Sequence, residues 1–146
     1  MKVPNLKPIG FIRTLKDQVA TGKAATSEIV IDEDLTEALD GIEQFSHMFV
    51  LYLFHLADES DRNVLKAHPQ NREDLPLVGV FVTRGAKRPN PIGLTLVEII
   101  ERKKNILTVK GLDAEDNSPV LDIKPYDQLD IAQRARMPDW WPVVDW

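Results

Sequence analysis

The stretch that decides the fold is residues 93–112, which read G-L-T-L-V-E-I-I-E-R-K-K-N-I-L-T-V-K-G-L. Both halves are rich in β-branched and large apolar residues, which fit the pleated surface of a sheet. Between them lies Lys103-Lys104-Asn105, whose polar character is typical of a hairpin turn. The stretch therefore predicts two antiparallel strands, 93–101 and 106–112.

Five other segments have the composition of strands. They are the residues around Ile9 and Phe11, then 27–31, 45–56, 77–83 and 119–123. Segment 45–56 is almost unbroken apolar and rich in aromatics, which predicts a strand buried on both faces. Six or seven strands indicate a mainly β domain, and closing the single sheet into a β-barrel would leave no exposed edge.

One helix is predicted between the second and third of these strands. Apolar residues at 35, 38, 39 and 42 follow the i, i+3, i+4, i+7 spacing of a helix face, and Asp32 or Asp34 can cap its start. Gly41 stands where a helix is expected to stop. The predicted fold is thus a single-sheet β-barrel with one or two short helices.

The composition is that of one soluble domain, residues 1–146, with 43% apolar and 28% charged residues. The absence of cysteine excludes disulfides, thiolate catalysis and sulfur-ligated metal, and it is typical of a reducing compartment. The N-terminus lacks the apolar core of a signal peptide. The most apolar run, 48–56, is far shorter than the roughly 20 residues of a membrane-spanning helix. We therefore expect a cytoplasmic protein without membrane contact.

The formal charge of −5 argues against general affinity for nucleic acid, but the charge is uneven. Segment 24–61 contains ten acidic residues and no Lys or Arg, so the rest of the chain carries all 18 cations against 13 acids. Segment 75–97 contains Arg84, Lys87 and Arg88 and no acid. This asymmetry permits a local anionic partner, although an uneven surface charge without a function would look the same.

The segment around those three cations reads T-R-G-A-K-R-P-N-P-I-G-L over residues 83–94. Two prolines restrict the backbone and lower the entropy cost of keeping the loop ordered around a ligand. Arg84 is the best candidate for a carboxylate or phosphate, because its guanidinium can bind two oxygens at once. A rigid surface turn with solvated charges is the alternative.

A second polar segment, 111–126, is rich in acids. Those at 113, 115 and 116 could hold a hard cation or an ammonium group, while Asp116-Asn117-Ser118 also has the composition of a simple turn. Asp122 lies in the middle of a predicted strand, where a carboxylate should be paired or functional if it points inward. If it points outward, it needs no special role.

The histidines do not form a metal site. His47 and His55 are eight residues apart on one predicted strand, hence roughly 25 Å apart. His55, beside an acidic loop, is the better functional candidate of the two, although the sequence alone favours a structural histidine there, and His68 carries little signal. Glycine-rich nucleotide loops, serine elbows and metalloprotease helices are absent from the sequence.

Several strings, in this order, resemble the TsaA-like, TrmO-type family of S-adenosylmethionine-dependent tRNA methyltransferases. They are Phe45-Ser46-His47-Met48, Phe54-His55, G-V-F-V-T-R at 79–84, R-P-N-P-I-G-L at 88–94, Gly111-Leu112-Asp113, and P-V-L-D-I-K-P-Y at 119–126. The resemblance covers a core of about residues 8–126 and leaves a Trp-rich tail, 127–146, that is hard to assign.

The resemblance implies a β-barrel that forms homodimers and binds S-adenosylmethionine near the dimer interface. It also implies methylation of N6 of threonylcarbamoyladenosine next to the tRNA anticodon. The implied cofactor contacts are His55, Leu56, Arg84, Leu94, Asp116, Asn117, Ser118 and Pro119. Arg84 would bind the cofactor's carboxylate, Asp116 its ammonium, and Leu56 and Leu94 its adenine. Lys87 and Arg88 are expected to contact RNA, and no metal is expected.

The carbamoylated N6 is a poor nucleophile until its proton leaves, so a general base is expected, with Asp122, His55 and Tyr126 as candidates. Two departures from the family bear on the substrate. The loop at 18–26 is short and lacks a Pro-Arg-Gln-like string, and the extra C-terminal domain of bacterial members has no counterpart before Trp146. A non-catalytic cofactor-binding regulatory module and a methyltransferase for another substrate therefore stay open as alternatives.

Overall fold

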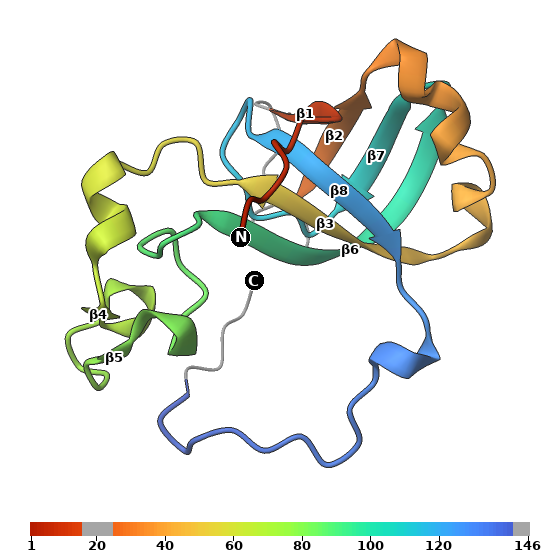
Figure 1. Ribbon diagram of the computed structural model, residues 1–146. Coiled ribbons are helices and arrows are strands. Elements are labelled where there is room, and N and C mark those ends of the chain that lie inside the picture. The colour runs from red at the N-terminus through yellow and green to blue at the C-terminus, as the bar shows by residue number, and fades with distance from the viewer. Residues whose placement is uncertain (16–24, 142–146) are drawn as a thin grey trace.

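Six antiparallel strands close into a barrel in the order β1-β2-β7-β6-β3-β8 (Figure 1). The strands are β1 (Gly10–Thr14), β2 (Thr26–Ile31), β3 (His47–Leu53), β6 (Ile92–Lys103), β7 (Ile106–Lys110) and β8 (Pro119–Pro125). This computed structural model describes residues 1–15 and 25–141. The prediction of a mainly β, barrel-forming chain is confirmed, and no helix among the described residues is long and apolar enough to cross a membrane.

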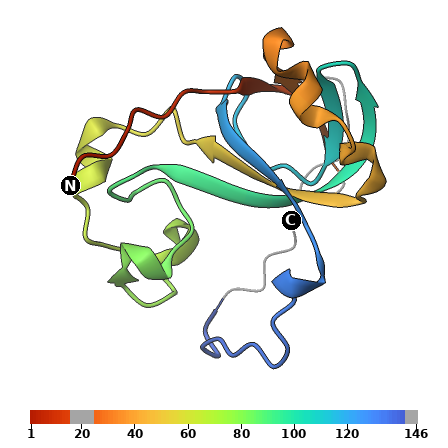
Figure 2. The same cartoon turned by 45° about the vertical axis from the view of Figure 1, so that its right-hand side comes forward.

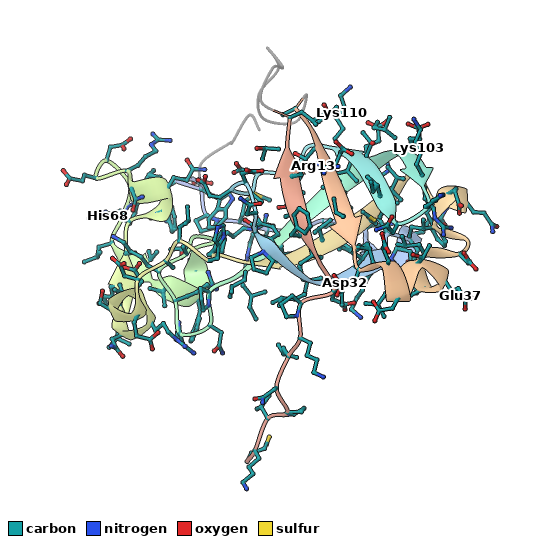
Figure 3. All side chains as sticks on the ribbon, turned by 90° about the horizontal axis from the view of Figure 1, so that it is seen from above. Arg13, Asp32, Glu37, His68, Lys103 and Lys110 are labelled. Carbon is teal, nitrogen blue, oxygen red and sulfur yellow. The ribbon has the colours of Figure 1, made fainter. Side chains whose placement is uncertain are left out.

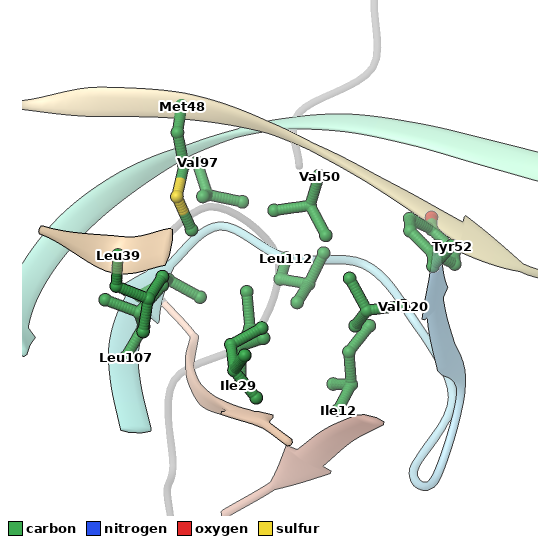
Figure 4. Packing of buried hydrophobic residues seen from close by; sticks show 12 residues of the cluster. Ile12, Ile29, Leu39, Met48, Val50, Tyr52, Val97, Leu107, Leu112 and Val120 are labelled. Carbon is green, nitrogen blue, oxygen red and sulfur yellow. The ribbon is translucent and has the colours of Figure 1, made fainter. Parts of the chain in front are cut away.

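Alternate residues of each strand point into the barrel and form its core (Figure 4). The innermost side chains are almost completely inaccessible to solvent: Ile12, Ile29, Met48, Val50, Val97, Leu107, Val109 and Val120. Burial of each such side chain contributes about 1.5–3 kcal/mol. A barrel this small is filled by its own side chains, so ligands must bind outside the interior.

Strand β3 corrects one prediction, because only one of its faces is fully buried. Met48, Val50 and Tyr52 point inward, whereas the alternate residues, including Phe49 and Leu51, are half-buried on the outside. The unbroken apolar sequence thus reflects two different environments. The inner face belongs to the core, and the outer face is an apolar surface of the barrel.

Both predicted turns are confirmed. Lys103 pairs with Ile106 across the β6–β7 hairpin, and Lys104 has a φ of 54° in the turn. Asn117, in the turn before β8, has a φ of 66°, a left-handed conformation that asparagine tolerates better than most residues.

The predicted helix is present in position but differs in type. It forms two 3-10 helices, η2 (Glu33–Leu39) and η3 (Ile42–Gln44), separated by Gly41 at a φ of 93°. Asp32 precedes η2, but its side chain makes no capping hydrogen bond. Only Leu39 of η2 is buried, so the segment covers the end of the core with one apolar residue.

The Arg102 side chain of β6 also attaches this helical segment to the barrel. Its guanidinium donates hydrogen bonds to the backbone carbonyls of Thr36 and Leu39, at 3.2 Å each, and forms ion pairs with Asp40 and Glu43 at 3.1 and 3.0 Å. Carbonyls at a helix end have no partner within the helix, so Arg102 satisfies groups that would otherwise require water.

The connection between β3 and β6 forms a lobe beside the barrel, at the end away from η2 and η3 (Figures 1 and 2). It contains η4 (Glu59–Asn63), β4 (Lys66–Ala67), η5 (Pro69–Asn71), β5 (Val78–Gly79) and η6 (Val80–Val82). The prediction of a strand over 77–83 is therefore wrong beyond β5. Val80 is buried, but Phe81 is 79% exposed, so this apolar segment lies on the surface of the lobe and does not extend the sheet.

After β8 the chain forms η7 (Gln128–Asp130), leaves the barrel and turns back beneath it (Figure 2). Most of the predicted loop at 18–26 lies within residues 16–24, which are outside the described residues. The end of the tail, 142–146, also lies outside them.

Candidate functional site

Two adjoining cavities lie at the junction of the barrel, the lobe and the segment between β7 and β8. Their volumes are about 490 and 740 Å³, within the range of ligand sites in proteins. Five residues line both cavities and form a common wall: Phe54, Gln70, Thr83, Gly85 and Asp113. Figure 3 shows His68, a residue of the first cavity, in the lobe and far from Asp32 and Glu37 of the acidic helical segment.

The first cavity brings together three of the predicted cofactor residues, His55, Leu56 and Ser118. His55 follows the end of β3, and its Nδ1 atom is buried with no hydrogen-bond partner among the described residues. Buried polar atoms are normally bonded, so this nitrogen has a hydrogen-bonding capacity that the described residues leave unused. Ser118 is buried and donates from Oγ to the carbonyl of Glu115 at 2.6 Å, which fixes the wall behind it.

The second cavity contains the other two predicted cofactor residues that reach a cavity, Arg84 and Leu94. Arg84 donates from one Nη to the carbonyl of Leu94 at 3.2 Å, which leaves other N–H groups of its guanidinium for an anionic ligand. Leu96 and Trp141 add apolar walls to this cavity. A ligand with an apolar ring and one anionic group fits this lining.

Tyr52 fixes the wall between the cavities. Its hydroxyl donates to the backbone carbonyl of Asp113 at 2.8 Å and lies 3.2 Å from Thr95 Oγ1. Burial raises the pKa of Tyr52, with a smaller rise from the Asp113 charge, so this hydroxyl stays protonated at neutral pH. The ring packs directly over Gly93, where an added Cβ would lie 2.5 Å from ring atoms. The Tyr52 ring can therefore occupy this position only because residue 93 has no side chain.

The loop at residues 83–94, called the basic loop here, carries Arg84, Lys87 and Arg88, and these cations differ in how many hydrogen bonds they form within the protein. Arg88 donates from Nη1 to the carbonyls of Thr83 and Gly85, at 3.0 and 3.2 Å, and so keeps the loop folded. Arg62 of the lobe adds a hydrogen bond to the carbonyl of Pro89 at 2.8 Å. Lys87 lines the first cavity. Of the two residues predicted to contact RNA, Lys87 is the better placed, because the Arg88 guanidinium already has partners in the loop.

In the predicted cofactor turn at 116–119, only Ser118 lines a cavity. Asp116 accepts a hydrogen bond from the backbone N–H of Thr14 at 2.9 Å, and the N–H of Asn117 donates to the carbonyl of Ile12 at 2.8 Å. Pro119 begins β8. Asp116 and Asn117 thus attach the turn to β1, and Ser118 is the residue of this turn that the structure brings to the site.

Two of the three candidate bases lie away from the cavities. Asp122 forms an ion pair with Lys124 at 3.1 Å and accepts from the N–H of Ile123 at 2.9 Å, with its side chain about half exposed. Tyr126 follows β8 and packs edge-on against Phe49 on the outer face, with ring centroids 5.8 Å apart. Neither residue lines either cavity. His55 is the one candidate base that the structure places in the site.

Asp113 lines both cavities. The sequence did not distinguish it from the neighbouring acids at 115 and 116. Burial raises its pKa, and the negative charge of Glu115 raises it further.

No group of three or more metal-ligating side chains that could hold an ion occurs in residues 1–15 and 25–141. Tyr52 gave no signal in the sequence, because its partners are 41 to 61 residues away along the chain.

Comparison with known proteins identifies the family to which this chain belongs. Residues 14–130 match the family described as tRNA-methyltransferase O N-terminal domain. The chain is 48% identical over 127 residues to a probable S-adenosyl-L-methionine-binding protein of Methanothermobacter thermautotrophicus, covering 83% of this chain and 88% of that protein. It is 37% identical over 110 residues to the Escherichia coli tRNA (adenine(37)-N6)-methyltransferase, covering 71% and 46%.

Among solved structures, TrmO from Pseudomonas aeruginosa superposes with a TM-score of 0.73 at 32% identity, over 95% of this chain and 62% of that one. The chain therefore spans less than two thirds of the TrmO crystal structure and less than half of the Escherichia coli enzyme. The family match includes every cavity-lining residue except Trp141, which lies beyond its end. The chain belongs to the family of tRNA-methyltransferase O N-terminal domains.

Proposed function

We propose that this protein is an S-adenosylmethionine-dependent methyltransferase that modifies tRNA. The observation that carries the proposal is the pair of adjoining cavities with a common wall. Methyl transfer joins two ligands, which must meet with their reacting atoms about 3–3.5 Å apart and aligned. The two cavities, which share Thr83, Gly85 and Asp113, together give room for a donor and an acceptor side by side.

The lining of the cavities is compatible with the chemistry of the cofactor. Arg84 can bind its carboxylate, and the unpaired Nδ1 of His55 can accept a hydrogen bond from its ammonium or ribose, or donate one, depending on the tautomer. Leu56 and Leu94 offer apolar contact to adenine. When bound, S-adenosylmethionine supplies a methyl group from a positively charged sulfonium. In this proposal, the residues of the chain orient both ligands and exclude water around them.

The finer assignment is methylation of N6 of threonylcarbamoyladenosine next to the anticodon. Its support is the family resemblance and the name of the Escherichia coli relative, a tRNA (adenine(37)-N6)-methyltransferase. An unpaired base needs an aromatic or apolar surface on which to stack, and Trp141 and Leu96 of the second cavity offer one. Lys87 lines the first cavity, and in this proposal its ammonium contacts a neighbouring phosphate.

The decisive experiment is transfer of labelled methyl groups to tRNA that carries the threonylcarbamoyl group, compared with the same tRNA lacking it. Selective labelling of the carbamoylated tRNA is the expected result. Equal labelling of both would contradict the finer substrate assignment but leave the tRNA methyltransferase in place. Labelling of neither, by protein that binds the cofactor, would contradict the proposed activity.

That last outcome would favour a second candidate, a cofactor-binding module that acts without transfer. One observation supports it: the Methanothermobacter relative, most of whose length this chain spans, is named for binding alone. A binding module predicts cofactor affinity that is unaffected by any tRNA, whereas an enzyme predicts that cofactor and carbamoylated tRNA bind together.

We also propose that the protein forms a homodimer through the outer face of β3 and β6. This face is apolar, with Leu94 and Leu96 of β6 paired with Leu51 and Phe49 of β3. Leu94 and Leu96 are 48% and 42% exposed, and they also line the second cavity, so a dimer on this face would lie next to the site. Light scattering should give twice the monomer mass of 16.6 kDa at micromolar concentration. A monomer mass would contradict the proposal.

A further inference from the structure

Resting on the proposed function, we propose that the Asp113 side chain is the base that takes the proton from the nitrogen that becomes methylated. Asp113 is the single carboxylate among the described residues that lines both cavities. The proton has to leave where donor and acceptor meet, so a base is expected at the common wall. The first cavity also contains Asp61 and Glu115, but neither of them lines the second.

The backbone around Asp113 is fixed while its side chain remains accessible. Gly111 has a φ of 92° at the end of β7, and Leu112 is 5% exposed and packed in the core. The Tyr52 hydroxyl holds the carbonyl of Asp113 from the other side at 2.8 Å. A catalytic carboxylate requires a rigid backbone at the cavity wall together with an accessible side chain.

The charges around Asp113 come from every element that forms the site. Glu115 lies on its own segment, Arg84 and Lys87 on the basic loop, His55 after β3, and Asp61 and His68 in the lobe. Partial burial and the charge of Glu115 both raise the pKa of Asp113. A carboxylate with a raised pKa is a stronger base than an ordinary one.

The step balances with no additional reactant. The N6–H bond of the carbamoylated adenosine breaks, and its proton passes to an Asp113 carboxylate oxygen. The nitrogen lone pair forms the new N–CH3 bond while the S–CH3 bond breaks, and the electron pair of that bond stays on sulfur, which becomes a neutral thioether. Asp113 then returns its proton to water.

The other groups in the site are less suited to this role. Tyr52 has a raised pKa and uses its proton in the bond to the Asp113 carbonyl. His55 lines the first cavity only. Asp122 and Tyr126 lie on the outer side of the barrel.

The test is the single-turnover rate of methyl transfer to carbamoylated tRNA at saturating cofactor and tRNA. Asp113→Asn should lower this rate by about 100-fold or more, the usual contribution of a general base, while both dissociation constants stay near those of the wild type. Asp113→Glu should restore part of the rate. Asp34→Asn, in exposed η2 and outside both cavities, is the matched control and should leave the rate unchanged. Thermal unfolding of each variant identifies any loss caused by misfolding.

The pH profile separates a base from a structural residue. A base acts when deprotonated, so the wild-type rate should fall as pH drops through the pKa of Asp113. Glu115→Gln removes the negative charge that helps to raise this pKa, so the fall should move to lower pH. Asp113→Asn should abolish this pH dependence.

Each contrary result has a distinct meaning. Weaker cofactor binding by Asp113→Asn, with a normal rate at saturation, would assign Asp113 to the cofactor ammonium and overturn the proposal. A large loss in Asp122→Asn with none in Asp113→Asn would also overturn it. Inactive wild-type protein would overturn the proposed function itself, and this inference with it.

Discussion

Replacing Gly93 by alanine tests whether Tyr52 is locked across the wall of the site. An added Cβ would lie 2.5 Å from two atoms of the Tyr52 ring, and that ring is 4% exposed and cannot move outward without opening the core. Overpacking of this kind costs about 1–3 kcal/mol. Losing the bond from Tyr52 to Asp113 adds about 1 kcal/mol, and the better strand propensity of alanine returns about 0.5–1 kcal/mol.

The expected net loss in unfolding free energy is therefore about 2 kcal/mol, which corresponds to a fall in Tm of about 4–8 °C for a chain of this size. Urea unfolding followed by circular dichroism measures it. Gly85→Ala is the matched control, because an added Cβ there meets nothing within 4 Å. In a Tyr52→Leu background, Gly93→Ala should cost less, since the ring that it would strike is gone. If Gly93→Ala and Gly85→Ala unfold at the same midpoint, the packing argument is refuted.

Three further predictions concern the arginines and the lysine of the site and the barrel. Arg84→Ala should remove most of the cofactor-induced stabilisation, which for the wild type is about 2.7 kcal/mol at 100 times the Kd and is measured by thermal shift. Lys87→Ala should weaken tRNA binding and reduce the slope of log K against log[salt] by about 1, with cofactor affinity retained. Arg88→Ala should instead loosen the loop and so weaken the binding of both cofactor and tRNA, and parallel titrations of the two ligands distinguish the variants. Arg102→Ala should lower the unfolding free energy by about 2–4 kcal/mol, because backbone carbonyls lose their donor, and Arg102→Lys should recover little of it, since an ammonium cannot span the same acceptors; urea unfolding measures both.

The strands of the barrel were predictable because their signals are local. The β6–β7 hairpin combines β-branched strands with a polar turn, and the turn at Asn117 uses a residue that tolerates its positive φ. The segment 77–83 has equally strong strand composition but lies in the lobe, where only Val78–Gly79 finds a partner strand. Composition predicts that a segment could be a strand, whereas pairing depends on a neighbour that the local sequence does not specify.

The site was predictable in part, for the same reason. Arg84, Leu94, His55, Leu56 and Ser118 were expected from the resemblance to the family, and the structure brings them to the two cavities. The wall between the cavities did not follow, because Tyr52, Gly93 and Asp113 are distant in sequence and meet only when the barrel closes.

The path of the chain between β3 and β6 has a consequence for how such a protein can change. Leu53 and Ile92, the residues at the two ends of this path, are already paired neighbours in the sheet. Residues 54–91 are therefore an insertion into what is otherwise a hairpin, and a short turn could in principle join the two strands without altering the barrel. Much of the cavity lining lies within this insertion. Mutations can accumulate there, and new substrates can be acquired, while the six strands continue to fold as before.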